Sequence, residues 1–476
     1  MIALILICVV LLLFQWSIKR PRNFPPGPPS IPILGSVPFL ELNNFHLSAE
    51  KLRDKYGPVI GLRFGNRNAI IVCGAREVEE TLRRDEFQGR PQFTVTGKGV
   101  MFSDGEFWIH QRRFTLRHLR DFGFGKNSME DVVLGEVDDF FHSYFENCNT
   151  VQVSGLFNTS VINVLWAMMG GKRYPHDDQE FRLLLDCLQK RFRNGTVAGS
   201  FKNRHPFLSK LLPFLKQVKE ENVIDELIRN FLMKAFKEHK LTKEGEPRDF
   251  IDVYLNELDS SKSLHSSFSE QTLLNVCTEF FSAGAESVGN SLGFNLLYCV
   301  LYPEWQEQLY DEITSVIGKN KPSLSDKKSL HKVEAFMTEV SRCNTIASFT
   351  VPHRCLTETT LNGYTIPKDC MVLISLYATL QDKKHWGDPE NFRPSRFLDT
   401  QGTFVKHKEG LPVFGAGKRV CPGESLARNT LFLFFTSMIQ HYKFVIPDDH
   451  PRPSTIPLSG FTQAPQPFEV TVTRRS

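Results

Sequence analysis

A single cysteine, Cys421, stands in the stretch FGAGKRVCPGESLARNTLFLFF, between two glycine-rich turns and an apolar helical pattern. Pro422 suits the first turn of that helix, where a missing N–H is not needed. Free N–H groups and the helix dipole favour an anion there, so we expect the thiol to ionise easily. A thiolate in such a cradle attacks a substrate or binds a metal. An inert buried cysteine is the plain alternative.

Two further segments offer donors for an anionic group. FWIHQRRF places Trp108 and Arg112 on one face of a helix, and both side chains only donate hydrogen bonds. TVPHRC adds His353 on an irregular segment, and Arg419, close to Cys421, can pair with a nearby carboxylate. Taken separately, each of these reads equally well as an ordinary solvated side chain.

One carboxylate and two guanidinium groups form a candidate structural network. Glu339 and Arg342, in KVEAFMTEVSR, are three residues apart and can pair on a helix. A buried ion pair needs further partners, and Arg396, in FRPSRF, is the candidate third member. The alternative is an exposed helix pair.

Small residues interrupt a long helical pattern in FFSAGAESVGNSLG. Its glycines, Gly284 among them, cost helix stability and leave room for a group to approach. Glu286 and Ser287 could relay protons, and Ser287 could also bond back to a carbonyl of the preceding turn. Ordinary helix packing is the alternative reading.

The elements that must position these residues are mainly α-helices with small β-sheets, an α+β class. Long helical patterns cover residues 130–147, 222–240 and 270–302. Residues 58–74 and 362–378 each predict two short strands around a turn, and residues 468–475 predict a last strand. The order is not the regular alternation of a doubly wound sheet.

The N-terminus predicts a membrane anchor. Residues 1–18 are almost entirely apolar and near the lower length limit for a span, and basic residues follow at once. A cleaved signal peptide would carry its charge before the apolar run, so we expect a transmembrane anchor with the bulk of the chain in the cytosol. The basic, proline-rich residues 19–35 predict a stiff hinge. Residues 36–476 show no repeat or linker and predict one large domain.

Composition narrows the class further. A net charge of +4 is too small to argue for nucleic acid, and 40 phenylalanines predict an apolar interior that can include a lipophilic cavity. The 10 cysteines contain no CxxC pair, so a zinc site of that type is not expected, and their scatter fits a reducing compartment. No GxGxxG fingerprint follows a strand, which argues against a fused dinucleotide-binding domain.

Together these segments resemble the cytochrome P-450 superfamily of haem-thiolate monooxygenases, over essentially the whole chain. The FxxGxRxCxG loop is matched by Phe414, Gly417, Arg419, Cys421 and Gly423, WxxxR by Trp108 and Arg112, ExxR by Glu339 and Arg342, and PxRF by Arg396. The phrases PPGPPSIPILG and VPHR look like those of the microsomal family-two branch. Ser287 departs from the threonine that the family usually has.

The resemblance implies haem b, with Cys421 as the axial iron ligand. It implies that the haem propionates are held by Trp108, Arg112, His353, Arg419 and Arg90. Gly284, Glu286 and Ser287 would line the oxygen side. NADPH-derived electrons would arrive through a separate reductase, with cytochrome b5 as a further partner. The docking surface would be the basic stretch Arg112, Arg113, Arg117, His118, Arg120 and Lys126, joined by Lys418 and Arg428.

The implied activity is insertion of one atom of O2 into a fatty acid, terpenoid, steroid or xenobiotic, at the endoplasmic reticulum membrane with the catalytic domain on the cytosolic face. Pocket walls are expected from residues 91–99, 183–215, 280–287, 345–351 and 455–461, with Phe93, Phe192, Phe280, Phe281, Phe349 and Phe461 as apolar lining. An O2-independent haem-thiolate isomerase or dehydratase, a non-catalytic membrane haem carrier and a cysteine hydrolase are the alternatives. The acid and hydroxyl of Glu286 and Ser287 argue against the isomerase.

Overall fold

The computed structural model describes residues 20–65, 67–91, 98–146, 149–195, 206–212, 214–260, 267–405 and 411–475. The predicted anchor, residues 1–18, lies outside the described residues. Among the helices that are described, none is long and apolar enough to cross a membrane.

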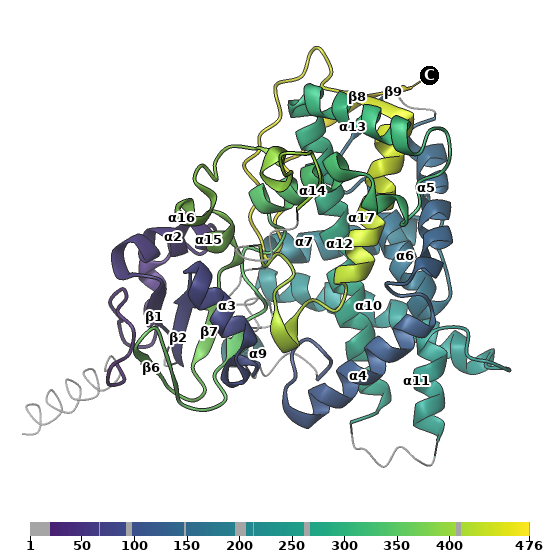
Figure 1. The fold of residues 1–476 in the computed structure, drawn as a ribbon. Coiled ribbons are helices and arrows are strands. Elements are labelled where there is room, and N and C mark those ends of the chain that lie inside the picture. The colour runs from purple at the N-terminus through teal and green to yellow at the C-terminus, as the bar shows by residue number, and fades with distance from the viewer. Residues whose placement is uncertain are drawn as a thin grey trace, which may run out of the picture.

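Helices dominate the described chain, as expected (Figure 1). The α-helices are α2 (Phe45–Tyr56), α3 (Ala75–Arg83), α4 (Gly105–Asp121), α5 (Glu130–Tyr144), α6 (Asn158–Gly170), α7 (Gln179–Asn194), α9 (Pro206–Leu211), α10 (Lys216–Leu241), α11 (Phe250–Asp259), α12 (Glu270–Leu301), α13 (Pro303–Val316), α14 (His331–Cys343), α15 (Leu376–Leu380), α16 (Lys383–Trp386) and α17 (Glu424–His441). Two of the short 3₁₀ turns between them matter for the site, η5 (Pro394–Phe397) and η6 (Gly417–Arg419).

The strands form three small sheets. The first is mixed, in the order β1 (Val59–Phe64), β2 (Arg67–Val72), β7 (Met371–Ile374) and β4 (His353–Arg354). The second is antiparallel, in the order β3 (Thr150–Gln152), β9 (Glu469–Arg474) and β8 (Tyr442–Val445). The third pairs β5 (Thr359–Leu361) with β6 (Tyr364–Ile366).

The two strands predicted in residues 362–378 exist but do not pair with each other. β6 pairs with β5, whereas β7 pairs with β2 in parallel and with β4 in antiparallel fashion. Every residue of β7 is buried, which suits a strand in the middle of a sheet. The prediction of a hairpin there is therefore wrong in its pairing.

Side chains that alternate along β1 and β2 pack into two hydrophobic clusters, one on each face of the first sheet. Val59, Ile70 and Val72 pack into a cluster on one face, whereas Ile60 and Ile71 pack into a cluster on the other. Neighbouring side chains of a strand point to opposite faces, so both faces of this sheet are covered. The sheet lies beside the helical part of the molecule, at the left of Figure 1.

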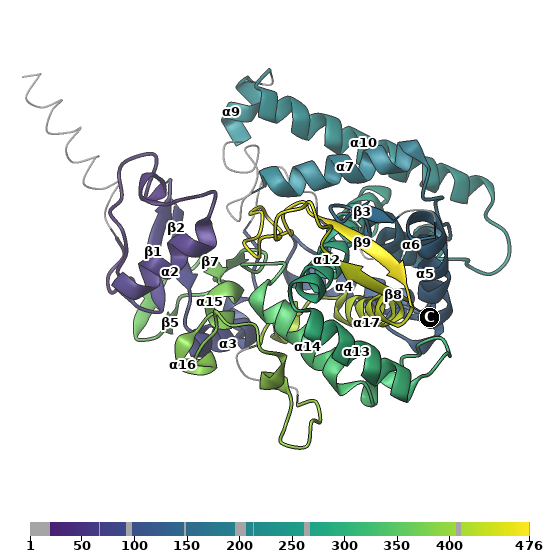
Figure 2. The ribbon, with the colours of Figure 1, turned by 90° about the horizontal axis from the view of Figure 1, so that it is seen from above.

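α12 is the central helix of the helical part. It is apolar nearly all round, as a helix covered on every side must be, and it packs against α6, α7, α10, α11, α13, α14 and α17 (Figure 2). Its glycines serve this packing. A Cβ on Gly284 would lie 2.6 Å from Cδ2 of Leu165 in α6, and one on Gly289 would lie 2.5 Å from Oδ1 of Asn158 in α6.

The proline-rich segment lies against the first sheet. The N–H of Gly61 in β1 donates to the carbonyl of Pro26 at 2.8 Å, and Nδ2 of Asn23 donates to the carbonyl of Gly363 at 2.9 Å. The Arg20 guanidinium donates to the carbonyls of Pro25, Gly27 and Pro28. The later end of the segment is held as well, because Gly35 forms a β-bridge with Phe64 at the end of β1.

Candidate active site

The Cys421 loop joins η6 to α17. Gly415 and Gly417 adopt positive φ angles of 74° and 67°, which glycine reaches at no steric cost. Gly417 approaches the carbonyl of Leu82 in α3 so closely that a Cβ could not be accommodated. The N–H of Cys421 donates to the carbonyl of Phe414 at 2.9 Å, which closes the loop around the sulfur.

The environment of the thiol differs from the expectation. Burial raises the pKa of Cys421, although the N–H groups of Gly423 and Glu424 and the charge of Arg112 oppose that rise. The expectation that this thiol ionises easily is wrong for the polypeptide alone, because burial outweighs the helix N-terminus. The residue nevertheless has solvent-accessible surface. A metal cation at the sulfur would favour the thiolate that burial disfavours.

Trp108 and Arg112 share one face of α4 and meet the Cys421 loop. Nη2 of Arg112 donates to the carbonyl of Val420 at 2.7 Å. The Arg419 guanidinium lies 3.8 Å from the centre of the Trp108 ring. The indole N–H of Trp108 is buried and has no hydrogen-bond partner among the described residues. A buried donor of this kind is costly unless an acceptor meets it.

Arg90, Arg419 and His353 lie next to this pair and are held by backbone carbonyls. Arg90 donates from Nη1 to Val351 at 2.9 Å and to Pro352 at 3.0 Å, and Arg419 donates from Nε to Gln88 at 3.0 Å. Nδ1 of the buried His353 contacts the carbonyl of Phe87 at 2.7 Å, which makes Nδ1 the protonated nitrogen.

Burial and mutual repulsion depress the basicity of this group. Burial, then the charges of Arg419 and Arg112, lower the pKa of Arg90 well below its usual value. Burial lowers the pKa of Arg419 to about 10, and burial and then Arg90 lower the pKa of His353. In the described chain no carboxylate bonds to the side chains of Arg90, Arg112 or Arg419. A largely buried cationic cluster, in which Arg90 is buried and Arg112 and Arg419 are partly buried, together with the unpaired indole N–H fits the two propionates of a haem.

The middle of α12 presents small accessible residues. Ala283 is exposed, and Gly284 and Ser287 are partly accessible, between neighbours that are buried. Oγ of Ser287 donates to the carbonyl of Ala283 at 2.9 Å, the back-bond that its position in the helix allows. A central helix with such a stripe can line one wall of an internal chamber.

Glu286 does not stand alone on α12. Its side chain is 2% exposed, and Oε1 accepts from Nη2 of Arg193 in α7 at 2.7 Å. Its Oε2 accepts from Oγ1 of Thr462 at 2.6 Å. Sequence reasoning missed Arg193 and Thr462, because no local pattern links residues so far apart in the chain.

A second carboxylate on α12, the partly buried Glu279, was also missed. It accepts from the backbone N–H groups of Val100 and Met101 at 2.6 and 2.7 Å. Burial raises the pKa of Glu279 to about 7, against the opposing effect of these N–H groups. Glu279 thus fastens the segment that follows residue 97 to the central helix.

The network predicted around Glu339 is present and buried. Nε and Nη2 of Arg342 contact the two oxygens of Glu339 at 2.7 and 2.9 Å, and Nε of Arg396 in η5 contacts Oε1 at 3.2 Å. Arg342 also donates to the carbonyl of Pro389 at 2.8 Å. These contacts tie α14 to η5, which is a structural role.

The predicted apolar lining divides into three groups. Phe192 and Phe461 lie with ring centres 6.0 Å apart, and Phe280 is buried on α12 at the edge of the core, where its ring contacts Phe124. Phe281 is fully buried against Trp166, so it is a core residue instead. Phe349 likewise packs in the core against Phe45. Phe93 lies outside the described residues.

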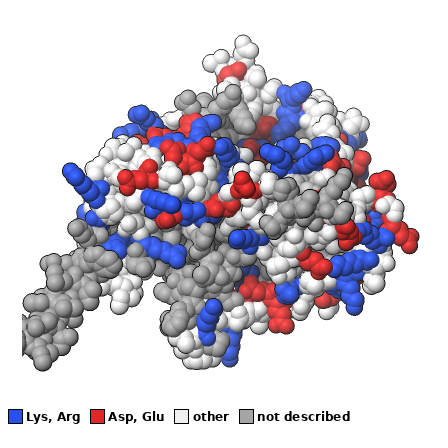
Figure 3. All heavy atoms as spheres, turned by 90° about the horizontal axis from the view of Figure 1, so that it is seen from below, with Lys and Arg blue, Asp and Glu red and all other residues white. Residues whose placement is uncertain are grey.

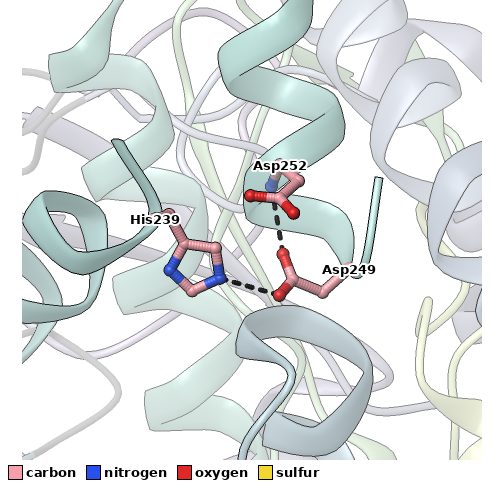
Figure 4. A group of neighbouring side chains, drawn as sticks. All are labelled: His239, Asp249 and Asp252. Carbon is pink, nitrogen blue, oxygen red and sulfur yellow. Dashed lines mark hydrogen bonds and ion pairs between the residues drawn. The ribbon is translucent and has the colours of Figure 1, made fainter. Parts of the chain in front are cut away.

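His239, Asp249 and Asp252 form a buried cluster that sequence reasoning did not find (Figure 4). Nε2 of His239 contacts Oδ2 of Asp249 at 2.7 Å, and its Nδ1 contacts the carbonyl of Ala235 at 2.7 Å. Both contacts require an N–H, so the imidazole is an imidazolium here. Asp252 is taken by Arg248, which donates from Nε at 2.6 Å. The cluster is therefore an ion-pair network and leaves no imidazole lone pair for a metal.

Comparisons with known proteins agree with this site. A family model described as cytochrome P-450 matches residues 25–472. Farnesoate epoxidase of Bombyx mori is 34% identical over 487 residues, which cover 99% of this chain and 98% of that protein. Cytochrome P-450 2C23 of Rattus norvegicus is 34% identical over 485 residues, with 98% and 96% covered. Cytochrome P-450 2U1 of Homo sapiens is 33% identical over 520 residues, with 99% and 93% covered.

The family implies a haem-thiolate cofactor, which the cationic cluster beside Cys421 and the spare indole donor of Trp108 fit independently. The match spans the chain from the described proline-rich segment to the last strand. The chain therefore belongs to the cytochrome P-450 family and is a monooxygenase.

Proposed function

We propose that this enzyme inserts one atom of O2 into a lipophilic small molecule, by hydroxylation or epoxidation, with electrons that NADPH supplies through a separate reductase. The observation that carries the proposal is the cationic cluster of the buried Arg90 and the partly buried Arg112 and Arg419 beside the Cys421 loop, with the unpaired indole N–H of Trp108. Such a cluster is costly by itself and becomes stabilising around a dianionic porphyrin edge.

Each residue of the site has a proposed task. Cys421 would bind the iron, and Trp108, Arg112, His353, Arg419 and Arg90 would hold the propionates. The haem, when bound, supplies oxygen-activating iron, and thiolate ligation favours O–O cleavage. The turns at Gly415 and Gly417, with φ angles of 74° and 67°, would shape the backbone that surrounds this ligand.

Proton delivery is the proposed task of α12. The Ser287 hydroxyl donates to Ala283, and rotation about χ1 would turn it from that carbonyl towards the accessible face of the helix. Glu286 holds its carboxylate one residue away, between Arg193 and Thr462. A change of partner at Glu286 would make that carboxylate available to pass a proton to Ser287. Gly284 keeps this part of the helix close to α6.

The substrate class is proposed from the apolar lining and from one relative. Phe192, Phe280 and Phe461 suit an apolar guest, and the Bombyx mori relative is named for action on farnesoate. We therefore place terpenoid epoxidation first within the wider class of fatty acids, terpenoids, steroids and xenobiotics.

A reductase docking surface is proposed on the outer face of α4. Arg113, Arg117 and Arg120 are exposed there and, within the described chain, form no ion pair. Lys418 and Arg428 are less available, because they pair with Asp85 and Glu424. Figure 3 views the side on which α4 lies in Figure 1 and shows acidic and basic side chains interspersed. Electrostatic steering of the reductase would thus come from the three exposed arginines of α4 rather than from a large surface patch of positive charge.

Attachment to the endoplasmic reticulum membrane by residues 1–18, with the enzyme on the cytosolic face, is also proposed. Its support is the apolar run followed by basic residues. Cytochrome b5 is proposed as a further electron donor that would use the same α4 row.

The deciding experiment reconstitutes the full chain with haem, NADPH and a reductase in phospholipid vesicles. We expect the strongly red-shifted Soret band of a thiolate-ligated carbon monoxide complex, NADPH-dependent oxygen uptake, and oxygenated product from farnesoic acid. Cys421→Ala should lose the band, whereas Cys187→Ala, which changes a cysteine of α7, should keep it. Product without oxygen uptake would favour an isomerase or dehydratase, and a band without any turnover would favour a haem carrier.

A further inference from the structure

A guanidinium reaches the oxygen-side helix from the far end of α7. Arg193 lies in the last turn of α7, and its Nη2 meets Oε1 of Glu286 at 2.7 Å. The Arg193 side chain is 19% exposed and that of Glu286 is 2% exposed, so the pair is largely shielded from water. A shielded ion pair is costly to form, which asks for a reason beyond the stability of the fold.

The backbone around Arg193 holds it in place. Its Nη1 donates to the carbonyl of Leu458 at 3.0 Å. The segment after Leu458 is fixed on α7, because the N–H of Phe461 donates to the carbonyl of Phe192 at 2.9 Å. A Cβ on Gly460 would lie 2.5 Å from the same carbonyl, so this close approach requires glycine. The cation is therefore positioned by three segments: α7, α12 and the loop around residue 460.

One donor of this guanidinium is unused. Nε of Arg193 is buried and has no hydrogen-bond partner among the described residues. Nε and Nη2 together form an edge that matches the two oxygens of a carboxylate, and Glu286 uses only Nη2. The site thus retains a buried donor beside a cation, next to the aromatic pair of Phe192 and Phe461.

The position of the pair relates it to the reaction. Glu286 is adjacent in the chain to Ser287 and one turn from the exposed Ala283, on the helix that we propose to line the oxygen side. A ligand that lies along this part of α12 can present a terminal group to Arg193 while its apolar body contacts the aromatic rings.

We propose that Arg193 is a specificity-determining residue that recognises the carboxylate of a lipophilic acid, in competition with Glu286. This inference rests on the proposed function and narrows its substrate class to amphipathic monocarboxylic acids. A substrate carboxylate on the Nε–Nη2 edge satisfies the buried N–H and displaces Oε1 of Glu286. Glu286 then keeps its hydrogen bond from Thr462 and becomes free to pass a proton to Ser287. An acid should therefore bind more tightly than its neutral ester, and a larger share of the oxygen consumed should appear in product.

The test compares acids with their methyl esters. Full-length haem-loaded enzyme in vesicles is titrated with farnesoic acid and methyl farnesoate, and with palmitoleic acid and its methyl ester, and the spectral shift on displacement of water from iron gives Kd. We expect each acid to bind roughly 10- to 100-fold more tightly than its ester, the range of a charge-assisted hydrogen bond. Arg193→Gln should abolish this ratio by weakening the acid and leave Kd of the ester within about twofold.

Matched variants separate recognition from folding. Arg191→Gln changes an exposed arginine two residues away that pairs with Asp225 at 2.8 Å, and it should behave as wild type. Because Arg193→Gln leaves Glu286 buried without its partner, Arg193→Lys and the double variant Arg193→Gln with Glu286→Gln accompany it. The lysine variant should retain part of the preference for acids. The neutral double variant should fold and prefer no acid.

The outcomes distinguish this inference from the proposed function. Equal affinity of wild type for acids and esters, or an equal loss for both in the Arg193 variants, overturns the role of Arg193 even if NADPH-dependent product forms. The opposite outcome is that acids bind in a way that depends on Arg193, but no oxygenated product forms with any electron donor. That outcome leaves the recognition role of Arg193 intact and overturns the proposed function.

Discussion

Glu339 and Arg342 form a two-point ion pair in which both side chains are 0% exposed, with N–O distances of 2.7 and 2.9 Å. Burial, the largest single effect, would lower the pKa of Arg342, but the hydrogen bond to Glu339 and the charges of Cys343, Glu339 and Tyr298 together raise it. Removal of one member of this ion pair would leave the other without its partner in the protein interior. Loss of one member should therefore destabilise the fold more than the intact ion pair stabilises it.

Arg342→Ala should reduce the free energy of unfolding by about 3–5 kcal/mol, the cost of an uncompensated buried charge. Denaturant unfolding followed by tryptophan fluorescence and by haem release measures the loss. Arg83→Ala removes an arginine from an exposed helix pair with Glu79 and should change stability by less than about 0.5 kcal/mol. Equal effects of the two variants would contradict a structural role for the buried network.

Trp108→Phe should weaken haem retention. The variant keeps the ring under Arg419 but removes the buried N–H that has no protein partner. Loss of one charge-assisted hydrogen bond corresponds to about 1.5–3 kcal/mol, so haem should transfer to apomyoglobin roughly 10- to 100-fold faster. Trp305→Phe, in α13 against Phe336, is the control. An unchanged transfer rate would exclude Trp108 as a propionate ligand.

The ion pair of His239 with Asp249 should make stability depend on pH. Burial by itself would lower the pKa of His239, but the hydrogen bond to Asp249, the carbonyl of Ala235 and the charge of Asp252 together raise it. A raised folded-state pKa means that this contribution is fully present below about pH 6.5, the usual histidine value, and is lost as pH rises through the folded-state value.

The check is the difference in Tm between wild type and His239→Gln, measured from pH 5.5 to 9. The difference should shrink as pH rises above about 6.5, while Arg248 remains charged beside Asp252 throughout. His142→Gln, at an exposed pair on α5, should show no such trend. A difference in Tm between wild type and His239→Gln that grows as pH rises would contradict a stabilising ion pair of His239 with Asp249.

Ser287→Thr should reduce the leak of reduced oxygen as peroxide. Threonine keeps the hydroxyl that donates to Ala283, and its methyl group restricts χ1 more than serine does. The measurement is peroxide released per product formed, with NADPH and reductase in excess. Ser291→Thr is a matched control, because Ser291 makes the same back-bond one turn later, to the carbonyl of Ser287. No fall in leak, or an equal fall in the control, would contradict the idea.

Charge reversal at Arg117 and Arg120 should slow reduction of the enzyme at low salt, and the rate should lose most of its dependence on ionic strength. Exposed charges on α4 act over a Debye length of about 10 Å at 0.1 M salt, so the effect should fade at higher salt. Arg474→Glu, on the exposed end of β9 at the opposite end of the molecule from α4 in Figure 1, is the control. Unchanged salt dependence would exclude this docking surface.

Local patterns predicted much of the fold and several of the contacts in the candidate site. Trp108 and Arg112 share a helix face because four residues make about one turn, and Glu339 pairs with Arg342 for the same reason. The helical pattern of residues 270–302 predicted the length of α12, which the structure gives as Glu270–Leu301. Arg396 could be named only because a buried pair demands further partners.

What the sequence did not predict depends on contacts between distant segments. Nothing near Arg193 indicates that it meets Glu286, 93 residues further along the chain. The pairing of β7 with β2 depends on burial of both faces of that strand, which its short apolar run does not reveal. The raised pKa of Cys421 depends on how tightly the surrounding elements enclose the sulfur.

The segment before β1 is fixed to the folded body by several hydrogen bonds. The Arg20 guanidinium donates to three carbonyls of the proline-rich segment, which contacts Gly61 in β1 of the first sheet and Gly363 in the turn between β5 and β6 of the third. A displacement of residue 20 should therefore move the strands with it, because the segment between them is not free to bend. The direction in which the described chain enters the folded body at residue 20 is therefore set by these contacts with the sheets.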